Sequence, residues 1–425
     1  MAQEIERVDA PAESTASIGV RAWLRRFDSP RGVALLTLLA YALFLAARLL
    51  RLGGDITRFT LASDKFIPAA SARSVGLSVL THGYGYDGQF YYLLALNPFA
   101  THPALAGASF DLPAYRAQRI LYPLLAWALS LGGRPALVPW MLVAINLAAI
   151  VAIGALGAKL AQRLGVAPLW GVALAFYPGL LVSLAGDLAE PLALACALGG
   201  LLCALTRPQP RWGWAALLLS LAVLARETTA LLAIALLAAA LLARLTPLPR
   251  LRIAALRLVA REQWRGAALA GVAPLLVALG WQVILLAHWG KFGLVAAGSN
   301  NLGPPLLGLL EGIVAWRVLW PPLTQALHAL DLVYLVALVE VARRALLRRR
   351  LAGWVSLAWA GYALLALCLT VFVWDYSWSF LRGAIELALL SLLLALGASP
   401  RARRFALAAT LALWAVTCIA TVAMS

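Results

Sequence analysis

The chain has 425 residues, of which 63% are hydrophobic and 12% are charged, and its mean hydropathy is +0.87. Such a composition excludes a soluble globular protein. Repeated apolar runs of roughly 15 to 23 residues predict an all-α, polytopic membrane protein whose partner is the lipid bilayer. A net charge of +17 would suggest nucleic acid in a soluble chain. Here the arginines lie between apolar runs, where the positive-inside rule accounts for them, so no nucleic-acid partner is expected.

Residues 1–30 are predicted to be a disordered cytoplasmic tail, and residues 31–425 a single transmembrane domain. No cleavable signal peptide is evident, so the first span, at about 33–52, is expected to direct insertion. By the positive-inside rule, the arginines before this span hold the N-terminus in the cytoplasm. These arginines are Arg21, Arg25, Arg26 and Arg31.

The polar stretch 53–117 then lies outside, with short interfacial helices expected at 63–80 and 89–96. The next apolar run, 118–131, is short for a bilayer crossing, and Gly132-Gly133 ends it. If it only dips into the membrane, nearly all later arginines fall on the cytoplasmic side, so we expect a re-entrant segment.

About 11 spans are expected in total, several of them shorter than a full bilayer crossing. Another short apolar piece, 304–320, is expected to lie in the interface. The spans after the first are expected at about 136–156, 168–185, 189–205, 212–226, 229–245, 267–288, 322–342, 351–373, 383–398 and 405–424.

The most distinctive stretch is HGYGYDGQFYYLLALNPF, residues 82–99, in the polar loop. Asp87 lies at its centre among glycines and aromatic residues. Glycines let a backbone approach a ligand closely, and aromatic faces cover the apolar face of a sugar ring. A carboxylate in this setting suits proton transfer on a polyol. The alternative is an ordinary interfacial loop, because tyrosines collect at membrane surfaces.

Ionisable residues at membrane depth are costly and indicate a functional site. Arginine forks among them could bind a phosphate while a carboxylate orients a hydroxyl. The alternative is structural pairing, of Arg226 with Glu227 or Glu190, and of Arg382 with Glu386 one helical turn later. The charges expected on the outer side are Asp87, Arg116, Arg119, Asp187, Glu190, Arg226, Glu227, Arg317, Asp375, Arg382 and Glu386.

Metal and cofactor motifs are not found in the sequence. The four cysteines are scattered in apolar segments, without metal-ligand spacing. Neither a metal nor a cofactor is therefore expected, although His82 and His102 share the loop with Asp87 and leave a divalent ion as an alternative.

The pattern resembles the GT-C superfamily of integral-membrane glycosyltransferases over most of residues 30–400. The resemblance is specific around Asp87 and loose elsewhere. The string YDGQFYYLLALNPF is similar to that of bacterial membrane proteins linked to cell-surface glycopolymer formation. The other matching stretches are RILYPLLA from Arg119, GDLAEP at 186–191, ARETT at 225–229 and WDYSWSFLR at 374–382.

The resemblance implies a glycosyltransferase of the inner (cytoplasmic) membrane. It would move a sugar from a polyprenyl-phosphate-linked donor to a glycan or glycolipid acceptor on the outer side. The family's first-loop acid corresponds to Asp87, as the base that deprotonates the acceptor hydroxyl. No DxD accompanies it, which favours a metal-independent reaction. Candidate substrate-binding residues are Tyr86, Gln89, Tyr91, Arg119, Asp187, Glu190, Arg226, Glu227 and Arg382.

Two other classes of protein remain open. A transporter or flippase for a lipid-linked glycan would also use short helices and buried charge, but such proteins usually show repeated halves or charges in the middle of several spans. The third possibility is a non-catalytic membrane subunit of a glycan assembly system. Activity with polyprenyl-phosphate sugars would separate the enzyme from both.

Overall fold

The computed structural model describes residues 27–206, 208–245, 261–298, 301–346 and 353–423. Every named element in these ranges is a helix, and β pairing there is limited to two isolated bridges, Ser63–Leu80 and Leu302–Leu369. The predicted all-α class is therefore confirmed for the described chain. The predicted tail lies outside these ranges except for residues 27–30, as do parts of the arginine-rich segments 244–265 and 343–350.

Six helices are long and apolar enough to cross a membrane, or up to eight if each of two bent pairs counts as one span. The chain is thus a multi-pass membrane protein. The long helices are α2 (Pro30–Arg51), α7 (Val138–Arg163), α12 (Ala230–Leu245, preceded by η3, Glu227–Thr229), α13 (Trp264–Trp289), α16 (Pro322–Leu346) and α21 (Pro400–Ala423).

The two bent pairs break within predicted spans. In the first pair, residues 168–175 comprise η2 (Pro168–Gly171) and α8 (Val172–Ala175), and the helix axis bends by 47° before α9 (Pro178–Ala185). In the second pair, the axis bends by 61° between α19 (Ser377–Gly383) and α20 (Ile385–Leu396). Three apolar helices are shorter: α10 (Glu190–Ala204), α11 (Trp212–Ala225) and α17 (Gly353–Leu367).

The remaining elements are short connections. They are η1 (Ile56–Thr60), α3 (Ala69–Ser74), α4 (Gly88–Leu96), α5 (Pro113–Ala117), α6 (Leu121–Leu129), η4 (Arg261–Gln263), α14 (Gly293–Ala296), α15 (Leu307–Leu319) and α18 (Val371–Trp374).

Of the two short helices predicted in the polar loop, one formed as expected and the other did not, while the re-entrant position of 118–131 stays a prediction. Helix α4 matches the predicted 89–96, and α6 is only nine residues long, about 14 Å at 1.5 Å per residue, well short of a bilayer. The predicted helix 63–80 is wrong, because only α3 is helical there. Pro68 precedes α3, and Gly76 has φ of +68°, outside helical geometry.

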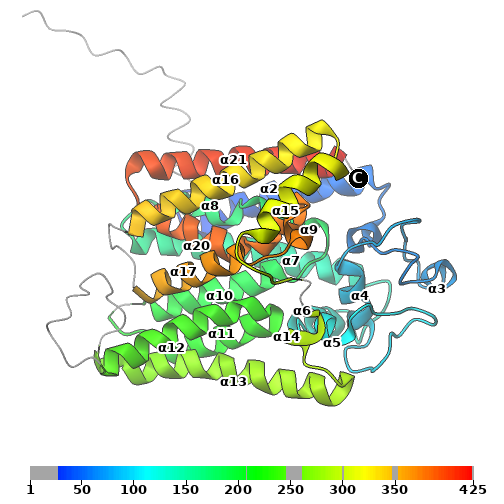
Figure 1. Ribbon diagram of the computed structural model, residues 1–425, viewed down its shortest axis with the longest axis horizontal. Coiled ribbons are helices and arrows are strands. Elements are labelled where there is room, and N and C mark those ends of the chain that lie inside the picture. The colour runs from blue at the N-terminus through cyan, green and yellow to red at the C-terminus, as the bar shows by residue number, and fades with distance from the viewer. Residues whose placement is uncertain (1–26, 207, 246–260, 299–300, 347–352, 424–425) are drawn as a thin grey trace, which may run out of the picture.

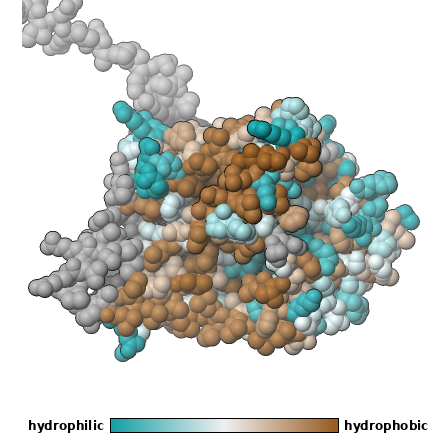
Figure 2. All heavy atoms as spheres, in the orientation of Figure 1, coloured by the Kyte–Doolittle hydropathy of each residue, from teal (hydrophilic) through white to brown (hydrophobic). Residues whose placement is uncertain are grey.

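Helix α20 is the centre of the bundle, since all twelve of its residues are buried. It packs against α16, α17, α21 and the segment formed by η2 and α8 (Figure 1). Figure 2 shows apolar residues over the body of the bundle and hydrophilic residues gathered towards its ends. An apolar girdle between polar ends is the surface that a bilayer requires.

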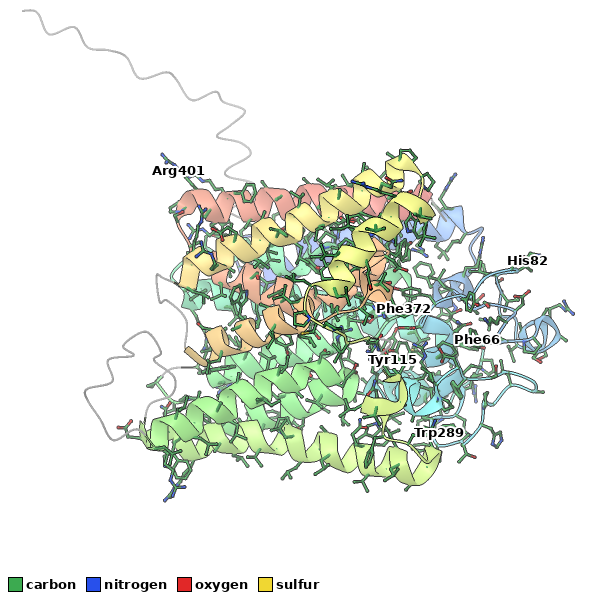
Figure 3. All side chains as sticks on the ribbon, in the orientation of Figure 1. Phe66, His82, Tyr115, Trp289, Phe372 and Arg401 are labelled. Carbon is green, nitrogen blue, oxygen red and sulfur yellow. The ribbon has the colours of Figure 1, made fainter. Side chains whose placement is uncertain are left out.

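The polar loop, residues 53–117, forms one end of the molecule, which we call the loop end (Figure 1). Figure 3 places His82 and Phe66 there, and Arg401 at the opposite end. The loop has its own hydrophobic core, in which Tyr92 and Ile67 pack with Tyr122 of α6. Because α4 is buried along its whole length, it is a fixed platform for the residue that precedes it, Asp87.

Candidate functional site

Asp87 sits at the start of α4, where three chain segments meet. A Cβ on Gly88 would come within 2.8 Å of the Thr60 carbonyl oxygen and 3.3 Å of Asp187 Cβ, so only glycine fits this close approach. Gly85, with φ of +64°, turns the chain into the helix. The glycines of the motif therefore serve close backbone packing that fixes Asp87 in place.

Asp87 is held between two guanidinium groups from distant parts of the chain. Its Oδ1 accepts from Arg116 Nη1 at 2.5 Å and its Oδ2 from Arg382 Nη1 at 2.7 Å. Burial alone would raise the pKa of this carboxyl, but the two arginines outweigh it and hold the pKa well below the usual value. Asp87 is thus a partly accessible, ionised carboxylate, with 14% of its side chain exposed.

Arg116 was in the expected outer charge set but not among the predicted substrate-binding residues. Besides its bond to Asp87, Arg116 donates two parallel hydrogen bonds to the Asp111 carboxylate, from Nε at 2.8 Å and from Nη2 at 2.5 Å. Its guanidinium lies 4.4 Å from the centre of the Phe90 ring. The spacing of Asp111 and Arg116 around the short α5 was the sequence signal for this fork.

A deeper layer of charge lies behind Asp87 and centres on Glu190. Glu190 Oε1 accepts a hydrogen bond from Arg226 and lies 3.4 Å from Arg382 Nε and 3.9 Å from Arg119 Nη1. Arg226 also donates from Nε to Glu386 at 2.6 Å and from Nη2 to the Arg382 carbonyl at 3.2 Å. Every nitrogen of Arg226 is therefore engaged.

Arg119 is engaged in the same way by Glu227. Its Nε and Nη2 donate to the two carboxylate oxygens at 2.9 and 2.7 Å, and its Nη1 donates to the Tyr91 hydroxyl at 3.4 Å. We call the nine linked side chains the Asp87 cluster. They are the five acids Asp87, Asp111, Glu190, Glu227 and Glu386, and the four arginines Arg116, Arg119, Arg226 and Arg382.

The pairings suggested by sequence proximity are partly wrong. Arg226 does pair with Glu190, but Glu227 pairs with Arg119 instead of its neighbour Arg226. Glu386 pairs with Arg226 instead of Arg382. The 61° bend between α19 and α20 explains this, because Arg382 and Glu386 lie on different helices and not one turn apart on a single one.

Gln89 and Tyr86, two of the predicted substrate-binding residues, have different surroundings. Gln89 is buried and connects two segments of the loop through hydrogen bonds. Its Oε1 accepts from Ser63 N at 3.1 Å, and its Nε2 donates to the Tyr84 carbonyl at 2.9 Å. Tyr86 lies beside the cluster, with its ring centre 5.1 Å from the Arg382 guanidinium.

Asp187, also predicted to bind substrate, is fully buried, and neither carboxylate oxygen has a hydrogen-bond partner among the described residues. It adopts a left-handed backbone conformation with φ of +49°. Burial raises the pKa of its carboxyl well above the usual value, which favours the neutral form. Asp187 therefore packs behind Gly88 and does not face the accessible side of the cluster.

A row of aromatic rings leads away from the cluster. Tyr86 meets Trp378 edge-on at 6.4 Å between ring centres, Trp378 lies 6.0 Å from Tyr376, and Tyr376 stacks on Trp320 at 5.2 Å. This row comes from the WDYSW stretch and from the end of α15. It provides apolar faces of the kind on which sugar rings pack.

Metal-binding geometry is not found in the described ranges, where no group of three or more His, Cys, Asp or Glu residues could hold an ion. All four cysteines are free thiols. The chain matches no protein-family model, and the comparisons with curated proteins and with solved structures gave no match either. A proposal for its function therefore rests on the geometry and chemistry of the Asp87 cluster.

Proposed function

We propose that the protein is a GT-C-like glycosyltransferase that transfers a sugar from a polyprenyl-phosphate donor to a glycan or glycolipid acceptor. The observation that carries this proposal is the position of Asp87, a partly accessible carboxylate fixed between two arginines beside an aromatic row. Adding α10, α11 and α17 to the eight spans of the upper count gives 11 spans, the number we propose for the membrane domain.

Arg382 and Arg116 are the groups we assign to the donor phosphate. Their side chains are 16% and 14% exposed, whereas those of Arg119 and Arg226 are only 7% and 5% exposed. A phosphate offers each guanidinium group a two-pronged contact, whereas each of these arginines makes only one hydrogen bond to Asp87. The deeper charged residues then hold Asp87, Arg116 and Arg382 in place. They are Arg119, Arg226, Glu190 and Glu386.

Phosphate binding also prepares Asp87 for its role. While both arginines are bound to Asp87, its lowered pKa makes it a weak base. Once they turn to the phosphate, its pKa returns towards the usual range. Asp87 then takes the proton from the acceptor hydroxyl as that oxygen bonds to the anomeric carbon. The bond from this carbon to the phosphate oxygen breaks, and the electron pair leaves with the phosphate, which the arginines stabilise.

The test is transfer by the purified protein with a panel of polyprenyl-phosphate sugars, comparing Asp87→Asn with Asp64→Asn. Asp64 is exposed and lies in the same loop, so it is the matched control. Asp55 and Asp111 are poorer controls, because Asp55 binds Thr57 and Ser78, and Asp111 holds Arg116. Loss of a general base lowers a rate by about a hundred- to ten-thousand-fold.

We expect that loss in Asp87→Asn alone. Full activity in a folded Asp87→Asn variant would reject the base, and inactivity of the parent with every donor would favour a transporter or a non-catalytic subunit.

A further inference from the structure

A polar pocket lies at the loop end of α2 and is lined in part by Trp378, whose ring also contacts Tyr86. It has a volume of about 550 Å³ and is formed by the end of α2, by η1 and by residues 78–80, with Trp378 and Thr421 completing its lining. The charged residues that line this pocket are Arg48, Asp55 and Arg58, and none of them belongs to the Asp87 cluster.

Arg48 is the unusual member of this lining. Its side chain is only 3% exposed, and its guanidinium lies 4.8 Å from the centre of the Phe59 ring. Nevertheless, its Nε and Nη1 have no hydrogen-bond partner among the described residues. A buried charged donor without partners is costly, so its presence on a pocket wall indicates a ligand with strong acceptors.

The surrounding charges leave this pocket positive. Arg58 is exposed and makes no ion pair within the described chain. Asp55 keeps its negative charge in the same lining, where its Oδ1 accepts from the Thr57 hydroxyl at 2.7 Å and its Oδ2 from the Ser78 hydroxyl at 2.5 Å, so Arg48, Arg58 and Asp55 together carry a net charge of +1. Asp187 acts on Arg48 only through space, and burial raises its pKa so that the neutral form is favoured.

We propose that this pocket binds the phosphate group of a phosphate monoester, through Arg48 and Arg58. The two guanidinium groups supply the donors and the net positive charge that attract a monoester, whose own charge is about −1.5 to −2 at neutral pH. A lipid headgroup and a water-soluble molecule are the two possible sources of the ester, and both present the same dianionic oxygens. In either case the ligand lies against Trp378, one ring away from Tyr86 and the Asp87 cluster.

The test is binding by the full chain in phosphatidylcholine nanodiscs. Phenyl phosphate, titrated by calorimetry, represents the soluble source, and phosphatidic acid, retained in native mass spectrometry, represents the lipid source. Arg48→Gln and Arg58→Gln should each weaken binding about tenfold or more, as expected for loss of a charge-assisted hydrogen bond. Arg51→Gln is the matched control, because Arg51 is exposed at the same helix end but does not line the pocket.

Binding of one probe and not the other identifies the source of the ester. Failure of the folded parent to bind either probe overturns the proposal, as does an equal loss in Arg51→Gln, which would indicate diffuse surface attraction. A loss in Arg382→Gln without a loss in Arg48→Gln or Arg58→Gln would place the bound phosphate at the Asp87 cluster and overturn the proposal. If Arg48→Gln fails to fold, Arg58→Gln decides the question, since that side chain is exposed.

Discussion

Asp87 joins two segments of the chain through its two oxygens, so its charge contributes to stability as well as to the proposed chemistry. Although Asp87 belongs to the polar loop, only 14% of its side chain is exposed and two arginines bind it. We expect Asp87→Asn to lower the free energy of unfolding by about 2 kcal/mol, as measured by chemical denaturation in detergent, because a charged hydrogen-bond partner is lost.

The pH dependence of this contribution follows from the lowered pKa of Asp87. A carboxyl whose pKa is lower in the folded state than its unfolded value of 3.8 stabilises the fold above that value, and the stabilisation fades as pH falls towards the folded pKa. The difference in melting temperature between the parent and Asp87→Asn should therefore be constant near neutral pH and shrink below about pH 4. A difference that grows on acidification would contradict the pairing.

Arg382 contacts three groups at once: Asp87, Glu190 and the Tyr86 ring. An ammonium group cannot reproduce this planar arrangement, so Arg382→Lys should raise the KM for the donor about tenfold or more. The matched control is Arg344→Lys on the exposed end of α16, where Arg344 pairs with Glu340. If Arg382→Lys keeps the parent's KM and kcat, Arg382 does not hold the phosphate.

At the scale of single elements, the start of α4 depends on the absence of a side chain at Gly88. Gly88→Ala places a methyl group against the Thr60 and Gly186 carbonyls, and such overpacking costs about 1–3 kcal/mol. Gly213→Ala is the control, because no atom lies within 4 Å of the added carbon on α11. It should leave stability unchanged or raise it slightly. Thermal unfolding of both variants measures the contrast, and equal melting temperatures would refute the close packing.

The helices themselves could be predicted from the sequence, because long apolar runs and their polar ends are local properties. The breaks at 176–177 and 384 were not predicted, although Pro178, at the start of α9, is a sequence signal for the first of them. The pairing of Glu386 with Arg226 depended on the break at residue 384. Long-range partners such as Asp87 and Arg382 were proposed as members of one site, but which atoms meet is decided by tertiary packing alone.

At the scale of the whole molecule, the two ends should face opposite sides of the membrane. Arg401 lies at the opposite end from the polar loop (Figure 3), as the arginine distribution predicts. In a variant without the four cysteines, an impermeant thiol reagent applied from outside should label Thr101→Cys but not Lys159→Cys or Arg401→Cys, all three at exposed positions. Labelling at 159 would show that α6 crosses the membrane, and labelling at 401 would invert the whole topology.

The hydrogen bond from Arg382 to Asp87 spans 295 positions of the chain, and this distance has a consequence for biosynthesis. At a translation rate of about 5–20 residues per second, Arg382 is made roughly 15 to 60 s after Asp87. Until the last helices insert, the nascent protein displays its entire glycine and tyrosine motif without the arginine that completes the cluster. A ribosome that stalls before this point leaves a polypeptide in the membrane that cannot carry out the proposed chemistry.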